Sequence, residues 1–266
     1  SLSRRQRQMC IRDRLKLILA EPGDTIHLES GMFSILGTLS MEGKNNVVIK
    51  GSGINGTILD FSTQVEGAQG LIITNCKNII LEDFSVQDAK GDAIKCQYVN
   101  GITFRHVKTQ WLGGPKPTNG AYGLYPVQCK NVLIEHCIAI AASDAGIYVG
   151  QSEDIIVRYS EAFDNVAGIE IENSTRADVY GNNVHGNTSG ILVFDLPDLP
   201  VKQGKLVRIF DNIIKNNNLD NFAPEGNIVG KVPAGTGIMI MATEMVEVFQ
   251  NTIIDNKTVG TAIVSY

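Results

Sequence analysis

The chain has 266 residues, of which 43% are hydrophobic and 19% are charged. This composition excludes a long disordered chain, and no apolar run of about 18 residues is present to form a membrane-spanning helix, so we expect a soluble protein. The formal net charge is −5, although five basic residues and only one acidic residue lie within residues 1–14. The remainder is therefore distinctly acidic, and we do not expect nucleic acid as a partner.

The two ends of the chain indicate a fragment. Residues 1–14 have neither the apolar centre nor the small-residue cleavage site of a secretory signal, and they resemble translated adapter sequence from shotgun-assembled DNA. We interpret them as a non-native or disordered leader, with a basic targeting tail as the alternative. Residues 260–266 end inside an expected strand, which would leave an open sheet edge. We therefore expect one domain over residues 15–266, truncated at its C-terminus and lacking its native N-terminus.

A unit of about 22 residues recurs along most of the chain. Residues 70–78 and 123–131 share Gly, Leu, Cys, Lys and Asn at the same five positions. In the second half, a Gly followed by alternating apolar residues opens each unit, mostly at intervals of 22 or 23 residues: Gly146, Gly168, Gly190, Gly237 and Gly260.

Each unit contains further short runs in which apolar and polar residues alternate, a pattern that predicts β-strands joined by tight turns. These second runs occupy residues 79–81, 102–104, 132–134, 155–157, 207–209 and 246–248. After the later runs, Asn recurs at two fixed positions, as Asn182 and Asn187 do after Val179. Asn tolerates left-handed backbone geometry, and its amide can stack in ladders between successive coils.

Three short strands in about 22 residues predict an all-β fold, a right-handed parallel β-helix of about ten coils between residues 24 and 266. A single coil buries too little apolar surface to offset its backbone entropy, so coils are expected to fold only when stacked. A leucine-rich repeat has a similar period, but it would need a helical return where this sequence has strands.

In such a fold, the residues between the inward apolar positions of each first strand point outward and stack one strand spacing apart. The first outward row is predicted to run Lys95, Tyr125, Tyr148, Glu170, Leu192 and Met239. The second is predicted to run Gln97, Val127, Gly150, Glu172, Phe194 and Met241. This face is polar and aromatic over its first four coils and apolar beyond them.

Three insertions break the period, and all lie beside this same strand. Residues 111–122 and 219–236 enter first strands, and residues 195–205 leave one. Loops rooted on both flanks of one face would build a walled groove, and long insertions in compact repeat proteins are often functional. We predict the functional site in that groove.

Four residues of the outward row carry the groups needed to abstract a proton next to a carboxylate. We predict catalytic roles for Lys95 or Tyr125 as the base and Tyr148 as the acid, with Glu170 beside them. An ordinary solvated strand face is the alternative interpretation of the same residues.

Seven residues around the groove are candidates for substrate binding: Trp111, Tyr122, Asp144, Gln151, Glu172, Asp195 and Asp198. Trp111 is the only tryptophan, and its ring could stack on a sugar. Asp195 and Asp198 are paired carboxylates that could hold a cation or act as acid and base. Turn formation is the alternative role for the polar residues, and loop anchoring is the alternative for Trp111.

Cysteine and histidine predict no metal site. The five cysteines include no CxxC pair and no Cys/His grouping at zinc-ligand spacing, so we expect buried or turn thiols. The four histidines, His27, His106, His136 and His185, lie in separate units, and we assign them structural roles. No cofactor is predicted, except that calcium could bridge the acidic protein and a polyanionic substrate.

Residues 15–266 resemble the bacterial parallel β-helix repeat-containing proteins of the pectin-lyase-like superfamily. The segments that carry the resemblance are Pro22-Gly-Asp-Thr-Ile26, Lys90-Gly-Asp-Ala-Ile-Lys95, Asn119-Gly-Ala-Tyr-Gly-Leu-Tyr-Pro-Val-Gln128, Ser143-Asp-Ala-Gly-Ile-Tyr-Val-Gly-Gln151, Gly168-Ile-Glu-Ile-Glu-Asn173 and Phe194-Asp-Leu-Pro-Asp-Leu-Pro200. The superfamily contains lyases, hydrolases and C5-epimerases of uronate polymers. This sequence lacks the Asp-Pro-His-Asp of alginate epimerases and the paired Asp with Gly-His of polygalacturonases.

The resemblance implies an exported protein that is periplasmic, anchored in the outer membrane or extracellular. Our first hypothesis is a polysaccharide lyase, C5-epimerase or glycoside hydrolase that acts on a uronate-containing polysaccharide or oligosaccharide along the first-strand groove. In it, Glu170 and Glu172 would position the sugar. The alternative is a non-catalytic binding or scaffold module of the cell envelope, which would recognise a glycan or an envelope protein.

Overall fold

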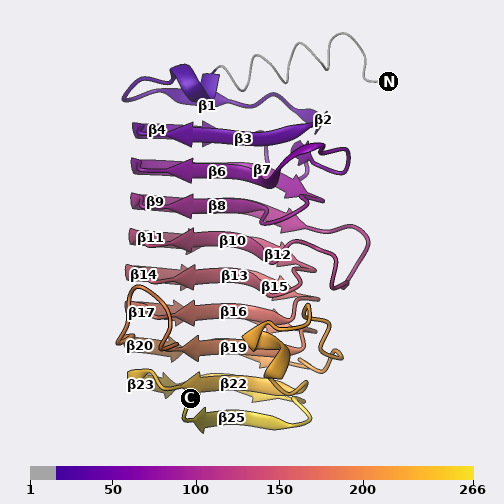
Figure 1. Cartoon of the computed structure of the whole chain (residues 1–266), viewed down its shortest axis with the longest axis vertical. Coiled ribbons are helices and arrows are strands. Elements are labelled where there is room, and N and C mark those ends of the chain that lie inside the picture. Colours follow the sequence, from indigo (N-terminus) through magenta and orange to yellow (C-terminus); the bar gives the residue numbers. More distant parts are fainter. Residues whose placement is uncertain (1–15) are drawn as a thin grey trace.

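The chain winds into a solenoid in which each coil lies on the one before it (Figure 1). The computed structural model describes residues 16–266, so the predictions about residues 1–14 and Cys10 lie outside the described residues. Residues 16–19 are helical, and Leu17 and Ala20 join the core at this end of the solenoid.

The strand that opens each coil belongs to a nine-stranded sheet, which we call the first sheet. Its strands are β3 (Gly37–Glu42), β6 (Glu66–Thr74), β8 (Ile94–Gln97), β10 (Tyr122–Val127), β13 (Ala145–Gly150), β16 (Ala167–Glu172), β19 (Ser189–Phe194), β22 (Thr236–Met241) and β25 (Val259–Val264).

The remaining strands form a 16-stranded second sheet, which is bent into two rows. One row comprises β1 (Thr25–His27), β4 (Asn45–Lys50), β7 (Lys77–Gln87), β9 (Asn100–Gln110), β11 (Lys130–Glu135), β14 (Glu153–Arg158), β17 (Thr175–Tyr180), β20 (Lys205–Phe210) and β23 (Glu244–Phe249). The other comprises β2 (Gly31–Ser34), β5 (Thr57–Asp60), β12 (Ile138–Ile140), β15 (Glu161–Phe163), β18 (Asn183–His185), β21 (Ile213–Lys215) and β24 (Thr252–Ile254). Strands β7 and β9 pair with members of both rows and so join them.

This architecture confirms the predicted parallel β-helix. Neighbouring strands pair in parallel in both sheets. Nine coils contribute a strand to the first sheet, and β1 and β2 form a partial coil before them. The return segments are strands rather than helices, which excludes a leucine-rich repeat.

The core consists of apolar side chains stacked on their counterparts in the next coil. On the first sheet, Leu124 pairs with Ile94 on one side and with Ile147 on the other, and all three are fully buried. Burying one such side chain stabilises the fold by about 1.5–3 kcal/mol. Each inward row therefore links successive coils, because every side chain is covered from above and below.

Two ladders of polar side chains line the turns, as the spacing of asparagines predicts. In one, the side-chain oxygen of Asn187 accepts hydrogen bonds from the backbone and side-chain nitrogens of Asn165, both at 2.9 Å. The side-chain nitrogen of Asn187 in turn donates to Asn217 at 2.9 Å. A parallel ladder runs through Ser160, Asn182, Asn212 and Asn251. Buried turn amides are thus satisfied from the neighbouring coil.

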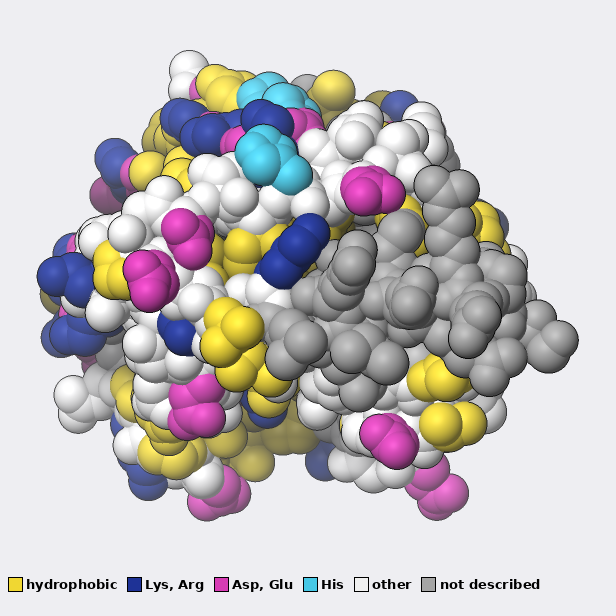
Figure 2. Space-filling view, turned by 90° about the horizontal axis from the view of Figure 1, so that it is seen from above, with side chains coloured by type: hydrophobic (Ala, Val, Ile, Leu, Met, Phe, Trp, Pro, Cys, Tyr) yellow, Lys and Arg dark blue, Asp and Glu magenta, His cyan; other side chains and the backbone are white. Residues whose placement is uncertain are grey.

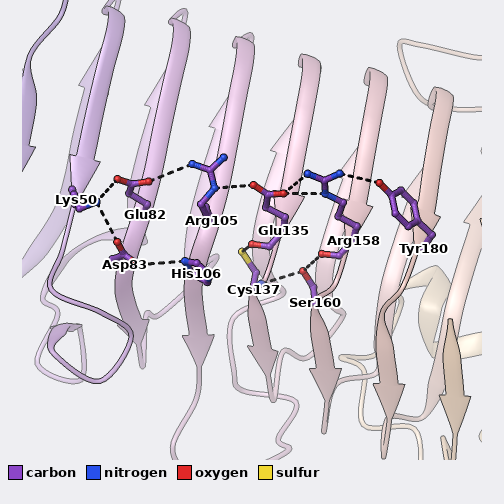
Figure 3. Close-up of polar contacts among 10 residues, drawn as sticks. All are labelled: Lys50, Glu82, Asp83, Arg105, His106, Glu135, Cys137, Arg158, Ser160 and Tyr180. Atoms are coloured by element: carbon purple, nitrogen blue, oxygen red, sulfur yellow. Dashed lines mark hydrogen bonds and ion pairs between the residues drawn. The ribbon is translucent and has the colours of Figure 1, made fainter. Parts of the chain in front are cut away.

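A ladder of ion pairs crosses the second sheet at one register position, from β4 to β14, through Lys50, Glu82, Arg105, Glu135 and Arg158 (Figure 3). Within it, Glu135 accepts hydrogen bonds from Arg105 at 2.7 Å and from Arg158 at 2.6 Å. Burial alone would raise the pKa of Glu135, but the hydrogen bonds from the two arginines outweigh it and lower the pKa. Arg158 also donates to the Tyr180 hydroxyl at 3.0 Å. These charges hold the coils in register.

The cysteines within residues 16–266 are buried, and two histidines on adjacent coils contact each other. Four thiols are free and buried, as predicted: Cys76, Cys96, Cys129 and Cys137. Burial raises the pKa of Cys129 to about 11 and that of Cys137 to about 12. His106 and His136, although they come from separate units, lie on adjacent coils with ring centroids 5.3 Å apart.

The surface carries charges of both signs. Seen from the N-terminal end, acidic and basic side chains are interspersed around the described part of the rim, with hydrophobic side chains showing between them (Figure 2). Among residues 16–266, no helix is long and apolar enough to span a membrane.

We predict that Asn187→Ala destabilises the fold by about 2–5 kcal/mol. The change leaves the buried backbone N–H of Asn165 without its acceptor and removes the hydrogen bonds that the Asn187 side chain donates to the Ala162 carbonyl and to Asn217. Each buried polar group without a partner costs about 1–3 kcal/mol. Urea denaturation followed by circular dichroism measures the loss.

The matched control is Asn100→Ala. The side chain of Asn100 accepts the same kind of ladder hydrogen bond, from Asn131 at 2.8 Å, but at an exposed position where water replaces it. We expect a change within about 0.5 kcal/mol. Equal effects of the two substitutions would contradict a stabilising role for the buried ladder.

Candidate functional site

The outward face of the first sheet has the two predicted rows. Tyr125 pairs with Lys95, Tyr148 pairs with Glu170, and Glu170 pairs in turn with Leu192. In the second row, Gly150 lies between Val127 and Glu172. The polar and aromatic part of this face therefore lies on β10, β13 and β16, as expected from the sequence.

Two inserted loops fold over this face. Asn173 fastens the loop of residues 195–204, because its side chain donates to the carbonyls of Leu196 and Val201 and accepts from the Leu196 amide, all at 2.8 Å. The loop of residues 216–235 contains a short 3-10 helix, η1 (Ile228–Lys231), and is fastened by Asn221, which donates to the carbonyls of Val229 and Val232 at 3.0 Å. Figure 1 shows this helical loop lying across the first sheet near β19.

The loops bury the apolar end of the face and leave a pocket at its polar end. Leu192 and Phe194 lie in a second apolar cluster with Val229 and Val232. Beside it, a pocket of about 460 Å³ is lined by Ala121, Tyr122, Tyr125, Asp144, Tyr148, Gln151, Glu170, Glu172, Leu196, Leu199, Asn227, Ile228 and Val229. The sequence predicts a walled groove on this face, and the loops form a pocket there in which Tyr148 and Glu170 are less than 5% exposed.

A short hydrogen bond joins two side chains of the pocket. The hydroxyl of Tyr148 donates to Oε1 of Glu172 at 2.5 Å. Gly150 makes this contact feasible, because a Cβ at that position would collide with the ring and hydroxyl of Tyr148. The missing side chain at Gly150 therefore lets the tyrosine lean along its own strand toward the next coil.

Three carboxyl groups face the pocket, and all three have raised pKa values. Burial, followed by the charge of Glu172, raises the pKa of Asp144 to about 7, against the lowering effect of a hydrogen bond from Tyr122. Burial and the charges of Asp144 and Glu172 raise the pKa of Glu170 well above its usual value. Burial also raises the pKa of Glu172, while the hydrogen bond from Tyr148 lowers it. Protons are therefore retained here at a pH where exposed carboxyls are ionised.

Three tyrosines form one wall of the pocket. The ring centroid of Tyr122 lies 4.5 Å from that of Tyr125 and 4.4 Å from that of Tyr148. Burial raises the pKa of Tyr125 to about 12, and burial together with the charge of Glu172 raises that of Tyr148. Lys95 lies behind this wall, with its Nζ 4.8 Å from the Tyr125 ring centroid, and it is not one of the lining residues.

Three of the predicted binding residues are not among those that line the pocket. Trp111 is 5% exposed and part of the main core, and its indole nitrogen donates to the Ala89 carbonyl at 2.8 Å. A ring buried in this way cannot stack on a sugar, so Trp111 is a loop anchor. Asp195 accepts a hydrogen bond from the Gly204 amide at 2.9 Å and so shapes its own loop. Asp198 is exposed and does not line the pocket.

Two polar residues of the site were not predicted from the sequence. Asn227, in the second loop, donates to Oδ2 of Asp144 at 3.4 Å. Asp92, whose pKa is raised by burial, lies close enough to raise the pKa of Asp144. Asp92 could have been found, because both it and Asp144 are followed by Ala just before a first strand. The contact of Asn227 has no such sequence signal.

Residues 16–266 contain no group of three or more His, Cys, Asp or Glu side chains placed to hold a metal ion. The calcium that the sequence suggests therefore remains a prediction.

A larger hollow, of about 1020 Å³, lies on the second sheet across β11, β14, β17, β20 and β23. Its charged side chains neutralise one another: Arg176 pairs with Asp154 and Arg208 pairs with Asp178, both at 2.6 Å. The carboxyl groups of the pocket on the first sheet have no Arg or Lys partner among the described residues that line that pocket. We therefore place the candidate site in the pocket on the first sheet.

Known proteins share this architecture. The model of the family described as right handed beta helix region matches residues 37–206, which confirms the predicted right-handed winding. No curated protein sequence matches the chain.

Solved structures of several carbohydrate-related proteins have a similar fold. The A-module of a mannuronan C-5 epimerase from Azotobacter vinelandii has a TM-score of 0.51 and 16% identity, covering 87% of this chain and 69% of that module. An exopolygalacturonase from Thermotoga maritima has a TM-score of 0.53 and 11% identity, covering 89% and 66%. The tailspike of E. coli bacteriophage HK620, in complex with a pentasaccharide, has a TM-score of 0.51 and 15% identity, covering 87% and 48%. This chain thus spans about half of the tailspike, and identities this low show the fold alone.

We predict that Asp144 makes the protein less stable as the pH rises from about 4 to about 7. The unfolded carboxyl has a pKa of 3.8 and the folded one a pKa of about 7. Between these values the folded state binds the extra proton, so its free energy of unfolding falls by up to about 1.4 kcal/mol for each rise of one in pH. Urea denaturation of the native protein and of Asp144→Asn at several pH values measures the difference between them.

The control is Asp198→Asn, which removes an exposed carboxyl from a loop beside the pocket. If the native protein and Asp144→Asn lose stability in parallel over this pH range, Asp144 does not have the raised pKa.

Proposed function

Since this chain belongs to the right-handed β-helix family, we propose that it acts on a carbohydrate held in the pocket beneath its two inserted loops. We further propose that the chemistry is general acid–base cleavage of a glycosidic bond by the carboxyl groups of the pocket. Asp144 would be the acid and Glu172 the base.

The observation that carries this proposal is that Asp144 and Glu172, which line one sugar-sized pocket, have different surroundings that act differently on their pKa values. Cleavage of a glycosidic bond needs a carboxylic acid that keeps its proton near neutral pH and a carboxylate that has lost its own. Burial and the charge of Glu172 hold the pKa of Asp144 at about 7. Burial raises the pKa of Glu172 as well, but the hydrogen bond from the Tyr148 hydroxyl counteracts this effect and favours the ionised form of Glu172. Asp144 can therefore protonate a leaving oxygen while Glu172 activates water.

The rest of the pocket suits a sugar. Pockets that bind small molecules combine apolar walls with a few placed polar groups, and their volumes run from about 300 to 1,000 Å³. Here the tyrosine wall offers ring faces to the apolar side of a pyranose, and Leu196 and Val229 lie on the loop side. The similar folds include an epimerase of mannuronan and a tailspike with a bound pentasaccharide, which supports a carbohydrate as the ligand.

The sequence alone favours a different chemistry, namely abstraction of the C5 proton of a uronate by Lys95 or Tyr125, with Tyr148 as acid, in a lyase or C5-epimerase. Two observations weigh against it. Lys95 does not line the pocket, and burial raises the pKa of Tyr125 to about 12, so its phenolate is scarce at neutral pH. We keep proton abstraction as the second candidate, because Tyr125 and Tyr148 both face the pocket. Export to the cell envelope, and a non-catalytic binding role there, also remain proposals.

We predict that the native protein releases reducing ends from its glycan substrate and that Glu172→Gln lowers the rate at least about 100-fold, the usual contribution of a general base. Proton NMR in D₂O, with a panel of neutral, amino and uronate glycans, detects new reducing-end signals. Loss of a C5 proton signal, or new alkene resonances, would instead establish the lyase or epimerase chemistry.

The matched control is Glu153→Gln. This substitution makes the same chemical change on the second sheet, where Glu153 pairs with Arg176 at 2.9 Å, away from the pocket. Full activity of Glu153→Gln, with loss in Glu172→Gln, supports the assignment. Equal activity of the two variants would remove Glu172 from the mechanism, and line broadening without turnover would leave only a binding function.

We also predict that Tyr148→Phe moves the acidic limb of the pH–rate profile to higher pH. The Tyr148 hydroxyl lowers the pKa of Glu172 by a hydrogen bond, so its removal raises that pKa and a higher pH is needed to ionise the base. Initial rates measured from pH 4 to pH 9 reveal the shift. A uniform loss of activity at every pH would show that Tyr148 acts in another way.

A further inference from the structure

We propose that the pocket selects a sugar that carries a positively charged amino group, such as a hexosamine with a free amine, rather than a uronate. This inference rests on the proposed function, because it names the substrate class of the same site. It comes from the charges that face the pocket and from one buried carboxyl oxygen without a partner.

The pocket is surrounded by acidic groups from several elements. Asp144 lies just before β13, and Glu170 and Glu172 lie on β16. Asp92, before β8, and Asp195, after β19, lie close enough to influence the pKa values of Asp144 and Glu172 respectively. Among the described residues that line the pocket there is no Lys, Arg or His. The remaining titratable groups that line the pocket are Tyr122, Tyr125 and Tyr148. Outside the lining, Lys95 lies over the Tyr125 ring, and its charge lowers the pKa of Asp92.

The carboxyl group of Glu170 points to a missing partner. Glu170 lines the pocket and is 3% exposed, and its Oε2 has no hydrogen-bond partner among the described residues. A buried polar atom of this kind is costly unless a ligand satisfies it. The neighbour of Glu170 in the next coil is the apolar Leu192, so the fold itself supplies no donor from that side.

The pocket needs a ligand that donates a hydrogen bond to Glu170 and carries positive charge, and an ammonium group meets both needs better than other ligands do. It carries three N–H donors and a full positive charge, whereas the carboxylates of the pocket are acceptors. A metal ion would need a set of closely placed ligands, and residues 16–266 contain no group of three that could hold one. The pocket volume of about 460 Å³ leaves room for a sugar ring that carries the amine.

A uronate fits poorly for the same reasons. Its carboxylate would be taken out of water into a site whose own carboxyls already retain their protons because of burial and mutual repulsion. No arginine or lysine among the described lining residues is available to pair with it.

Binding of an amine also implies release of protons. The raised pKa values of Asp144, Glu170 and Glu172 mean that the empty pocket holds protons. An ammonium group beside Oε2 of Glu170 favours the ionised form of that carboxyl, so its proton leaves as the ligand binds, while Asp144 keeps the proton that its role as acid needs. Affinity should therefore rise with pH until the amine of the sugar loses its own proton.

Isothermal titration calorimetry of the native protein tests this inference with four probes of equal length: oligomers of glucosamine, N-acetylglucosamine, glucose and galacturonate. We expect the glucosamine oligomer to bind at least tenfold more tightly than the other three. Titration in two buffers with different ionisation enthalpies should show protons released on binding. Glu170→Gln should weaken glucosamine binding by about 10- to 100-fold, the range for one charge-assisted hydrogen bond.

Glu153→Gln is the matched control, and thermal unfolding checks that both variants are folded. The comparison of probes on the native protein stands even if Glu170→Gln does not fold. Equal or tighter binding of a glucose, N-acetylglucosamine or galacturonate oligomer would overturn the inference and leave the proposed function intact. Binding of Ca²⁺ alone that depends on Glu170, without amine binding, would make the cluster a metal site and also overturn it. Absence of binding by all four oligomers would contradict both the inference and the proposed function.

Discussion

In-register stacking of one coil on the next is the interaction on which the rest of this structure depends. Parallel pairing places residues about 22 positions apart in the sequence at one strand spacing, about 4.8 Å. No coil buries its apolar side chains by itself. The core forms because such side chains stack on those of the neighbouring coils, as Leu124 does on Ile94 and Ile147. The same register aligns the ladder through Asn187 and the ion pairs around Glu135.

The candidate site lies where this regular pattern of satisfied rows is interrupted. Along the turns, Asn187 finds an equivalent residue in the next coil, and across the second sheet Glu135 finds its opposite charge in Arg158. On the first sheet, by contrast, Tyr148, Glu170 and Leu192 succeed one another, so the carboxyl of Glu170 has an apolar neighbour and an unpaired oxygen. Such local departures from the rules that stabilise a fold are typical of functional sites.

Sequence reasoning predicted which side chains share the outward face of the first sheet, but not all the residues that line the pocket. The period gives the outward rows, so the alignment of Tyr125, Tyr148 and Glu170 could be predicted from spacing alone. For Trp111, the structure supports the alternative interpretation, a loop anchor rather than a sugar platform. An insertion can fold inward as well as outward, and the Trp111 ring packs in the core. The contact between the tilted rings of His106 and His136 did not follow from the assignment of these residues to separate units, because residues one coil apart in sequence are neighbours in space.

The sequence by itself determined the solenoid, its register and the side chains on each face, because a repeat of about 22 residues leaves little freedom in how coils align. Only the tertiary structure decided how the inserted loops cover the apolar end of the face and leave a pocket at its polar end. The inserted loops have no repeat to follow, and their path depends on contacts such as those of Asn173 and Asn221 with loop carbonyls. That path buries Asp144 and Glu170, and the burial gives their carboxyl groups the raised pKa values on which the proposed chemistry relies.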